Sequence, residues 1–187
     1  MTAAIPPSQL ILVTGPSRSG KSEWAETLAS ASQKQVIYIA TSKIDPTDLE
    51  WQNRILIHKN RRPVEWITQE IPEDLTTTLP ILSRSDTCIL VDSLGTWLAN
   101  CLEQNESIWE MTQNHFLEIL TQLPGTIILV AEETGWGVVP AYPLGRTFRD
   151  RLGMLIRQIG AISTCVYLVT GGYVLNLTEL GSPLKPI

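Results

Sequence analysis

Eight consecutive residues near the amino terminus have the types and the spacing of a phosphate-binding loop. They read GPSRSGKS, a complete G-x-x-x-x-G-K-S pattern that directly follows a short apolar run. Glycines in such a loop let the backbone turn its N–H groups towards phosphate oxygens, and a following helix adds the positive end of its dipole. We expect Lys21 to reach the β- and γ-phosphates and the Ser22 hydroxyl to bind Mg²⁺. The pattern predicts a nucleoside triphosphate site formed by Gly15, Pro16, Ser17, Arg18, Ser19, Gly20, Lys21 and Ser22.

An aspartate at the end of another apolar run is the expected companion of this loop. The run Ile89–Val91 is followed at once by Asp92 and then by Ser93. A carboxylate at the end of a buried strand can hold Mg²⁺ or its water ligands beside a bound triphosphate. The alternative is an ordinary cap for the helix that follows. Asp86 precedes the same run and is expected at the end of the strand away from the nucleotide.

One of the two histidines stands directly before a cluster of cations. After His58 the chain continues with Lys59, Asn60, Arg61 and Arg62. A neutral imidazole can attack a phosphorus atom directly, and such cations would neutralise the phosphate oxygens. The alternative is the carboxyl end of a helix whose cations complement the helix dipole. Composition and spacing leave both readings of His58 open.

Two further polar residues carry weaker indications. Glu70 follows a short apolar stretch and can accept hydrogen bonds from a nucleotide base or ribose. His115 lies within a helix-like segment, away from the other candidates, and we expect it to be a packed or surface side chain.

The elements that must position these residues alternate between apolar runs and helix-like segments. Five runs are continuously apolar, as strands buried on both faces of a parallel sheet are: Leu10–Val13, Val36–Ala40, Cys88–Val91, Ile127–Ala131 and Cys165–Val169. Shorter strands are expected at Val64–Ile67 and Tyr173–Leu177. Helices are predicted over Ser22–Ala31, Thr47–Asn60, Leu94–Glu103, Ile108–Leu123 and Leu144–Ala161. This alternation predicts an α/β, P-loop NTPase-like layered fold with a mostly parallel central sheet flanked by helices.

Length and composition exclude several classes of protein. The chain has 187 residues, which predicts one domain over residues 1–187 with loose ends at about 1–8 and 181–187. Its net charge of −5 argues against a nucleic-acid or anionic-membrane partner. Three scattered cysteines without CxxC spacing fit a reducing compartment. With no signal peptide and no apolar stretch of about 20 residues, we expect a soluble, cytoplasmic protein.

Four stretches together resemble the bifunctional adenosylcobinamide kinase/adenosylcobinamide-phosphate guanylyltransferase family of cobalamin biosynthesis. The resemblance runs from Leu10 to about Leu177. It is carried by ILVTGPSRSGKSEWAE (11–26), YIATSKIDPTDLEWQNRILIHKNRRPVEWIT (38–68), ILVDSLGTWLAN (89–100) and GWGVVPAYPLGRTFRDRLGMLIRQIG (135–160). The last is the most diagnostic, because a G-x-G-V-V-P segment precedes a helix that opens with Arg146, Arg149 and Arg151.

The resemblance assigns roles to residues whose chemistry was open. In this family the histidine of the H-K-x-x-R-P stretch, here His58, attacks the α-phosphate of GTP and forms a guanylylated enzyme and pyrophosphate. The family's nucleotide contacts would fall on the phosphate-binding loop and on Thr41, Ser42, Lys43, Lys59, Asn60, Arg61, Arg62, Glu70 and Asp92. Family members assemble as homo-oligomers, reported as trimers, so a homo-oligomer is expected here.

The chain departs from the family pattern at two places. Pro16 occupies a position that is often glycine in relatives; it stiffens the loop and removes an N–H group. Glu132 and Glu133 stand where relatives usually have an Asn-Glu pair, which bears on corrinoid contacts rather than on the nucleotide site.

The resemblance implies two reactions on one domain. With Mg²⁺ on Ser22 and Asp92 and with Lys21 as the main cation, a nucleoside triphosphate, ATP or GTP, phosphorylates adenosylcobinamide. GMP then passes from GTP through His58 to the new phosphate. The alternatives are a plain small-molecule P-loop kinase, in which His58 is structural, and a non-catalytic nucleotide-sensing module.

Overall fold

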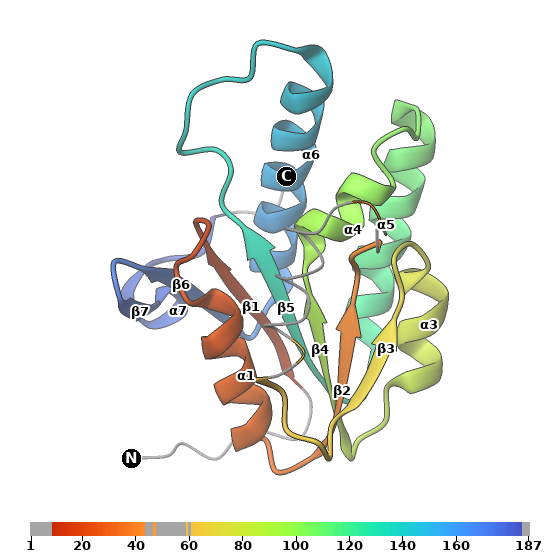
Figure 1. Cartoon of the computed structure of the whole chain (residues 1–187), viewed down its shortest axis with the longest axis vertical. Helices are drawn as coiled ribbons and strands as arrows, with labels where there is room; N and C mark the ends of the chain where they lie inside the picture. Colours follow the sequence, from red (N-terminus) through yellow and green to blue (C-terminus); the bar gives the residue numbers. More distant parts are fainter. Residues whose placement is uncertain (1–8, 44–46, 48–58, 60, 185–187) are drawn as a thin grey trace.

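A single seven-stranded sheet organises the chain (Figure 1). The computed structural model describes residues 9–43, 47, 59 and 61–184. The strand order is β3-β2-β4-β5-β1-β6-β7, and every pairing is parallel except that of β6 with β7. The strands are β1 (Gln9–Gly15), β2 (Gln35–Ala40), β3 (Ile67–Glu70), β4 (Thr87–Asp92), β5 (Thr126–Glu132), β6 (Cys165–Thr170) and β7 (Tyr173–Asn176). The predicted mostly parallel sheet is confirmed.

Helices cover both faces of the sheet. They are α1 (Lys21–Ala31), α3 (Leu75–Leu82), α4 (Leu94–Asn100), α5 (Glu106–Gln122), α6 (Pro143–Ile162) and α7 (Leu177–Leu180). Helix α1 packs on one face, where Ala25 and Ala29 join the alternate residues Ile11 and Val13 of β1. Helices α3 to α6 pack on the other face. None of the described helices is long and apolar enough to cross a membrane.

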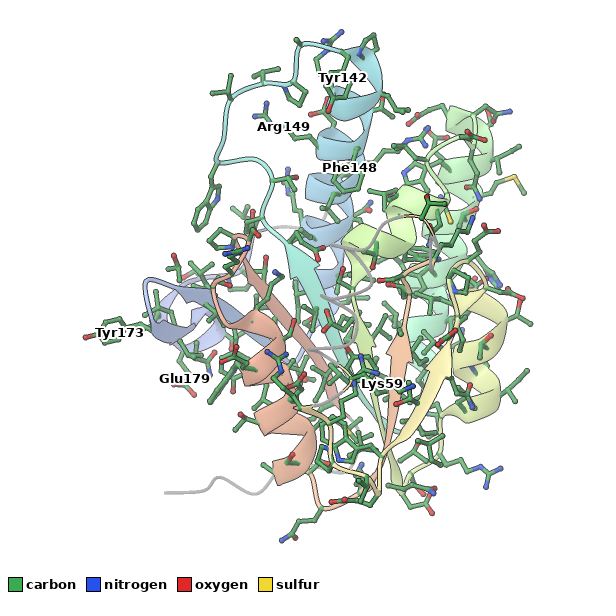
Figure 2. The ribbon with its side chains drawn as sticks, in the orientation of Figure 1. Lys59, Tyr142, Phe148, Arg149, Tyr173 and Glu179 are labelled. Atoms are coloured by element: carbon green, nitrogen blue, oxygen red, sulfur yellow. The ribbon has the colours of Figure 1, made fainter. Side chains whose placement is uncertain are left out.

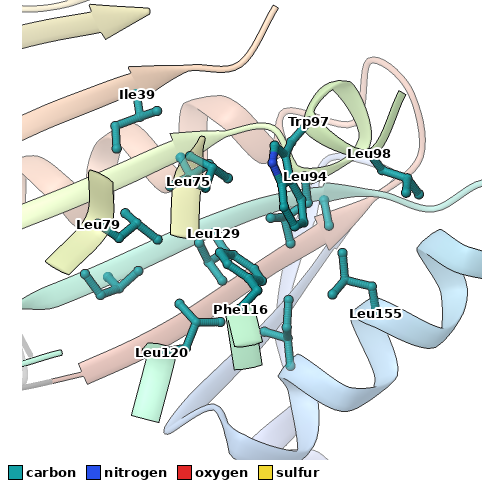
Figure 3. Close-up of a cluster of buried hydrophobic side chains, with 14 of the residues drawn as sticks. Ile39, Leu75, Leu79, Leu94, Trp97, Leu98, Phe116, Leu120, Leu129 and Leu155 are labelled. Carbon is teal, nitrogen blue, oxygen red and sulfur yellow. The ribbon is translucent and has the colours of Figure 1, made fainter. Parts of the chain in front are cut away.

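The larger core fixes helix α4 at the carboxyl edge of the sheet. Trp97 and Leu98 of this helix are fully buried, and the Trp97 ring lies 4.7 Å from that of Phe116, centroid to centroid (Figure 3). The Trp97 Nε1–H also donates to the backbone oxygen of Glu73 at 2.8 Å. An aromatic ring that is buried and hydrogen-bonded holds its backbone firmly. The amino end of α4 is therefore a fixed wall beside the strand ends.

Several element boundaries differ from the sequence predictions. The strand expected at Val64–Ile67 is β3 at Ile67–Glu70, because Pro63 accepts a hydrogen bond from Trp66 N–H in a turn that leaves Val64 fully exposed. The last strand stops at Asn176, whose side chain caps α7 instead.

The helices differ too. Helix α3 was not predicted, because its three threonines and Pro80 are poor helix formers. The helix predicted over Leu94–Glu103 ends at Asn100. Of the helix predicted over Thr47–Asn60, all but Thr47 and Lys59 lies outside the described residues.

Candidate active site

The phosphate-binding loop has the expected setting between a strand and a helix. Strand β1 ends at Gly15 and α1 begins at Lys21, with Gly20 at its amino cap in the left-handed region at φ 92°. A glycine takes this conformation without steric cost. Gly15 is required for a different reason: a Cβ there would lie 2.3 Å from the Val169 backbone oxygen of β6. The two glycines of the motif thus let the loop pass tightly over the sheet edge.

A large pocket opens beside this loop at the carboxyl ends of the strands. Its volume is about 810 Å³. Of the predicted site residues, it brings together Ser17, Arg18, Ser19, Gly20, Lys21, Ser22, Ser42, Arg61, Arg62, Glu70 and Asp92. Gly15, Pro16, Thr41, Lys43 and Lys59 are described but do not line it. His58 and Asn60 lie outside the described residues.

Asp92 lies at the end of β4, as predicted, and its carboxylate already has one donor. The Tyr38 hydroxyl donates to Asp92 Oδ2 at 2.8 Å. Burial raises the pKa of Tyr38, and the negative charge of Asp92 raises that pKa further. Tyr38 is therefore a neutral donor that orients the carboxylate of Asp92, a residue that lines the pocket.

Two arginines bring the segment after His58 to the pocket. Arg61 binds two carboxylates of α1, Glu23 at 3.1 Å and Glu26 at 3.0 Å. The guanidinium carbon of Arg62 lies 3.4 Å from the centroid of the Tyr38 ring, in cation–π geometry. These contacts hold Arg61 against α1 and Arg62 against β2.

Thr41 and Lys43 have partners of their own in the structure. The Thr41 hydroxyl donates to the Ser93 backbone oxygen at 2.7 Å and accepts from Ser93 N–H at 2.9 Å, and Thr41 is fully buried. It therefore ties the end of β2 to the start of α4. Lys43 forms an ion pair with Glu73. Their contacts with a nucleotide stay predictions.

The structure adds an acidic residue that the sequence analysis did not assign to the nucleotide site. Glu132 ends β5 and lines the pocket. Its Oε2 accepts from the Gly95 backbone N–H at 3.0 Å. Burial raises the pKa of Glu132, while the Ser93 hydroxyl and the Lys21 ammonium act in the opposite direction. The available signal was positional: Glu132 follows a buried apolar run just as Asp92 does.

Gly95 provides a test of how tightly this wall of the pocket is built. A Cβ at Gly95 would lie 2.0 Å from Glu132 Oε2. Gly95→Ala should therefore displace Glu132 or α4 and lower the free energy of unfolding by about 1–3 kcal/mol in urea titrations. Gly153→Ala in α6 is the control, because nothing lies within 4 Å of its added Cβ. The free energy of unfolding of the control should be unchanged or higher by up to about 1 kcal/mol. An equal decrease in both variants would contradict tight packing at Gly95.

Comparisons with known proteins identify the family. Residues 11–177 match the family described as cobinamide kinase / cobinamide phosphate guanyltransferase. The bifunctional adenosylcobalamin biosynthesis protein CobP of Pseudomonas aeruginosa is 40% identical over 92% of this chain and 98% of its own. The corresponding protein CobU of Salmonella typhimurium is 36% identical over 87% and 96%.

Solved structures with low identity support the fold. A protein of Pyrococcus horikoshii OT3 is 10% identical with a TM-score of 0.51, over 95% of this chain and 94% of that chain. An ATPase from the type III secretion system of pathogenic bacteria is 12% identical with a TM-score of 0.50, over 92% and 53%. The family match over residues 11–177 and the curated relatives at 36–40% identity show that the chain belongs to the cobinamide kinase / cobinamide phosphate guanyltransferase family.

Proposed function

We propose that this enzyme phosphorylates adenosylcobinamide with a nucleoside triphosphate and then transfers GMP from GTP to the new phosphate. One observation carries the proposal: a single pocket joins the phosphate-binding loop to Asp92 and to the arginines that follow His58. A kinase needs only the phosphate-binding loop and Asp92. A nucleotidyl transfer through His58 also needs cations beside that histidine. Family membership supports both activities.

In the phosphorylation step the chain positions the triphosphate and balances its charge. Lys21 and the N–H groups before α1 surround the phosphates. The hydroxyl of Ser22 and the carboxylate of Asp92, both in the pocket, are hard oxygen donors that fit Mg²⁺ together with phosphate oxygens. When bound, Mg²⁺ supplies neutralisation of the transferring group. The oxygen of the substrate hydroxyl attacks the γ-phosphorus and its proton is released to solvent. The bond between the γ-phosphorus and the bridging oxygen of the β-phosphate breaks, and the nucleoside diphosphate leaves.

In the guanylyl step a covalent intermediate divides the transfer in two. A nitrogen of His58 attacks the α-phosphorus of GTP, the bond to the β-phosphate oxygen breaks, and pyrophosphate leaves. A phosphate oxygen of the first product then attacks the same phosphorus, and the phosphorus–nitrogen bond breaks. Arg61 and Arg62 line the pocket, and in this proposal their charges help to neutralise the oxygens of the α-phosphate.

Incubation with GTP labelled in its α-phosphate tests this function directly. We expect protein-bound label without corrinoid, release of that label on adding phosphorylated cobinamide, and an intact mass raised by one GMP. A plain kinase would phosphorylate cobinamide and show no bound nucleotide. A nucleotide-sensing module would show only slow turnover with any acceptor and no adduct, and either result would overturn the proposal.

Replacement of Asp92 tests its assignment to Mg²⁺. Asp92→Asn should shift the Mg²⁺ concentration for half-maximal phosphorylation upward by roughly tenfold, about 1.4 kcal/mol, because a neutral amide is a poorer ligand for a hard cation. The fold should persist, because the amide oxygen can still accept from Tyr38. Asp86→Asn, at the opposite end of β4, is the control. An unchanged magnesium titration would make Asp92 a structural residue only.

We also propose that the enzyme is a homo-oligomer, with a trimer as the expected state. The outermost strand β7 and helix α7 expose large apolar side chains, among them Tyr173 at 76% and Leu180 at 69%. Exposed apolar surface next to a sheet edge is typical of a subunit contact. Light scattering of the purified chain would measure the mass, and a monomer at micromolar concentration would contradict it.

A further inference from the structure

A long connection beside the pocket exposes apolar side chains. Residues 133–142, here called the arm, join β5 to α6 and arch out past the carboxyl edge of the sheet (Figure 1). Trp136 is 60% exposed, Val138 94%, Val139 57% and Tyr142 66%. So many large apolar residues exposed in one short segment indicate a binding surface.

The arm is held in place although its side chains are exposed. Arg146 donates to the backbone oxygens of Pro140 at 3.0 Å and Ala141 at 2.8 Å. Arg149 donates to the oxygen of Gly135 at 3.3 Å and lies between the arm and α6 (Figure 2). The guanidinium groups of these two arginines thus donate hydrogen bonds to backbone carbonyls of the arm itself. The arm therefore presents its apolar residues from a braced backbone, which lowers the entropy lost on binding.

The first residue of the arm is hydrogen-bonded to β1, the strand that leads into the phosphate-binding loop. Glu133 N–H donates to the Gly15 oxygen at 3.0 Å, and the Thr14 hydroxyl donates to Glu133 Oε1 at 2.8 Å. The next residue, Thr134, lines the nucleotide pocket, and so does Phe148 of α6. The arm is thus continuous with the place where the triphosphate binds.

Two glycines leave the surface around Trp136 open. A Cβ added to Gly135 or to Gly137 would meet nothing within 4 Å, and neither residue has a left-handed φ. The fold itself therefore does not need a glycine at either position. Their small size keeps the two positions that flank the indole free for an approaching group.

The acceptor has the chemistry that suits such a surface. A corrinoid is a broad macrocycle with apolar faces, and the group it offers to the enzyme lies at the end of a side chain. The pocket of about 810 Å³ must already hold the nucleotide, so the macrocycle has to rest outside it. Resting on the proposed function, we propose that the arm binds the corrin ring, with Trp136 as the main contact, so that the reacting side chain extends into the pocket.

Replacement of Trp136 tests this site with cobinamide itself as the probe. Trp136→Ala should raise both the KM for cobinamide in the kinase assay and its calorimetric Kd at least tenfold, because aromatic anchors carry much of such binding. The KM for the nucleotide and the GMP adduct formed without corrinoid should not change. Trp136→Phe should stay within about threefold of wild type, and Val138→Ser should give a smaller rise than Trp136→Ala.

The controls separate this inference from its competitors. Ile81→Ala removes an apolar side chain of similar exposure, 69%, from α3, and should leave the cobinamide KM unchanged. An unchanged KM in Trp136→Ala would overturn the arm as the corrinoid site while the proposed function stands. A changed oligomeric mass in that variant would make the arm a subunit contact instead. Failure of the wild-type enzyme to bind cobinamide would overturn the proposed function and this inference together.

Discussion

Lys21→Ala is expected to abolish both phosphorylation of cobinamide and formation of the GMP adduct. Lys21 begins α1 within the pocket, and the triphosphate used in either step would lose its main cation there. The loss in transition-state stabilisation should be about 3–4 kcal/mol, or roughly 10²–10³-fold in rate. Steady-state kinetics with each nucleotide would measure it.

Lys34→Ala is the matched control for that experiment. The Lys34 ammonium donates to Thr126 at 3.0 Å, at the amino end of β5 and away from the nucleotide pocket. Removing this lysine changes the net charge by the same amount and should leave both rates close to wild type. Turnover near the wild-type rate in Lys21→Ala would take the phosphate-binding loop out of the mechanism.

His58→Ala should separate the two activities. The variant should form no GMP adduct and transfer no GMP, because the other histidine, His115, is not followed by a comparable cation cluster. Phosphorylation of cobinamide should largely survive, since that transfer uses the phosphate-binding loop and Asp92 but no nucleophilic imidazole. A GMP adduct on His58 would be a phosphoramidate, so the wild-type adduct should be labile to acid and stable to base. Mass spectrometry of the digested protein would locate it.

His115→Ala provides the control for that separation. His115 lies exposed on α5, and it should be replaceable without effect on either activity. Label on His115 or on a lysine, or an adduct that persists in His58→Ala, would rule out His58 as the nucleophile and favour the plain kinase.

The phosphate-binding loop and Asp92 could be predicted because local sequence determines them. A G-x-x-x-x-G-K-S run between a strand and a helix leaves its backbone few alternatives, and an acid after a buried run must lie at the strand end. Glu132 obeys the same rule at the end of β5. Its assignment failed because nothing in the linear sequence shows that β5 lies between β1 and β4, and so beside the pocket.

The roles of the arginines of α6, in contrast, could not be predicted from the sequence. Sequence marked Arg146, Arg149 and Arg151 as a diagnostic group and gave no means of dividing their tasks. In the structure Arg146 and Arg149 brace the arm, whereas Arg151 is buried and binds the Gln104 oxygen and Glu106, both at 3.0 Å. The division depends on which loops return to the helix, and a tertiary contact of that kind leaves no local pattern.

The phosphate-binding loop, Arg61 and Arg62 line one pocket, and this bears on the order of the two half-reactions. In the proposed cycle the same pocket binds a phosphoryl donor for the kinase reaction and GTP for the guanylyl transfer. If the pocket holds one nucleotide at a time, the first would have to leave before the second could bind, and the two half-reactions would alternate. A phosphoryl donor other than GTP would then inhibit guanylylation competitively, and the rate of the cycle would depend on the ratio of the two nucleotides.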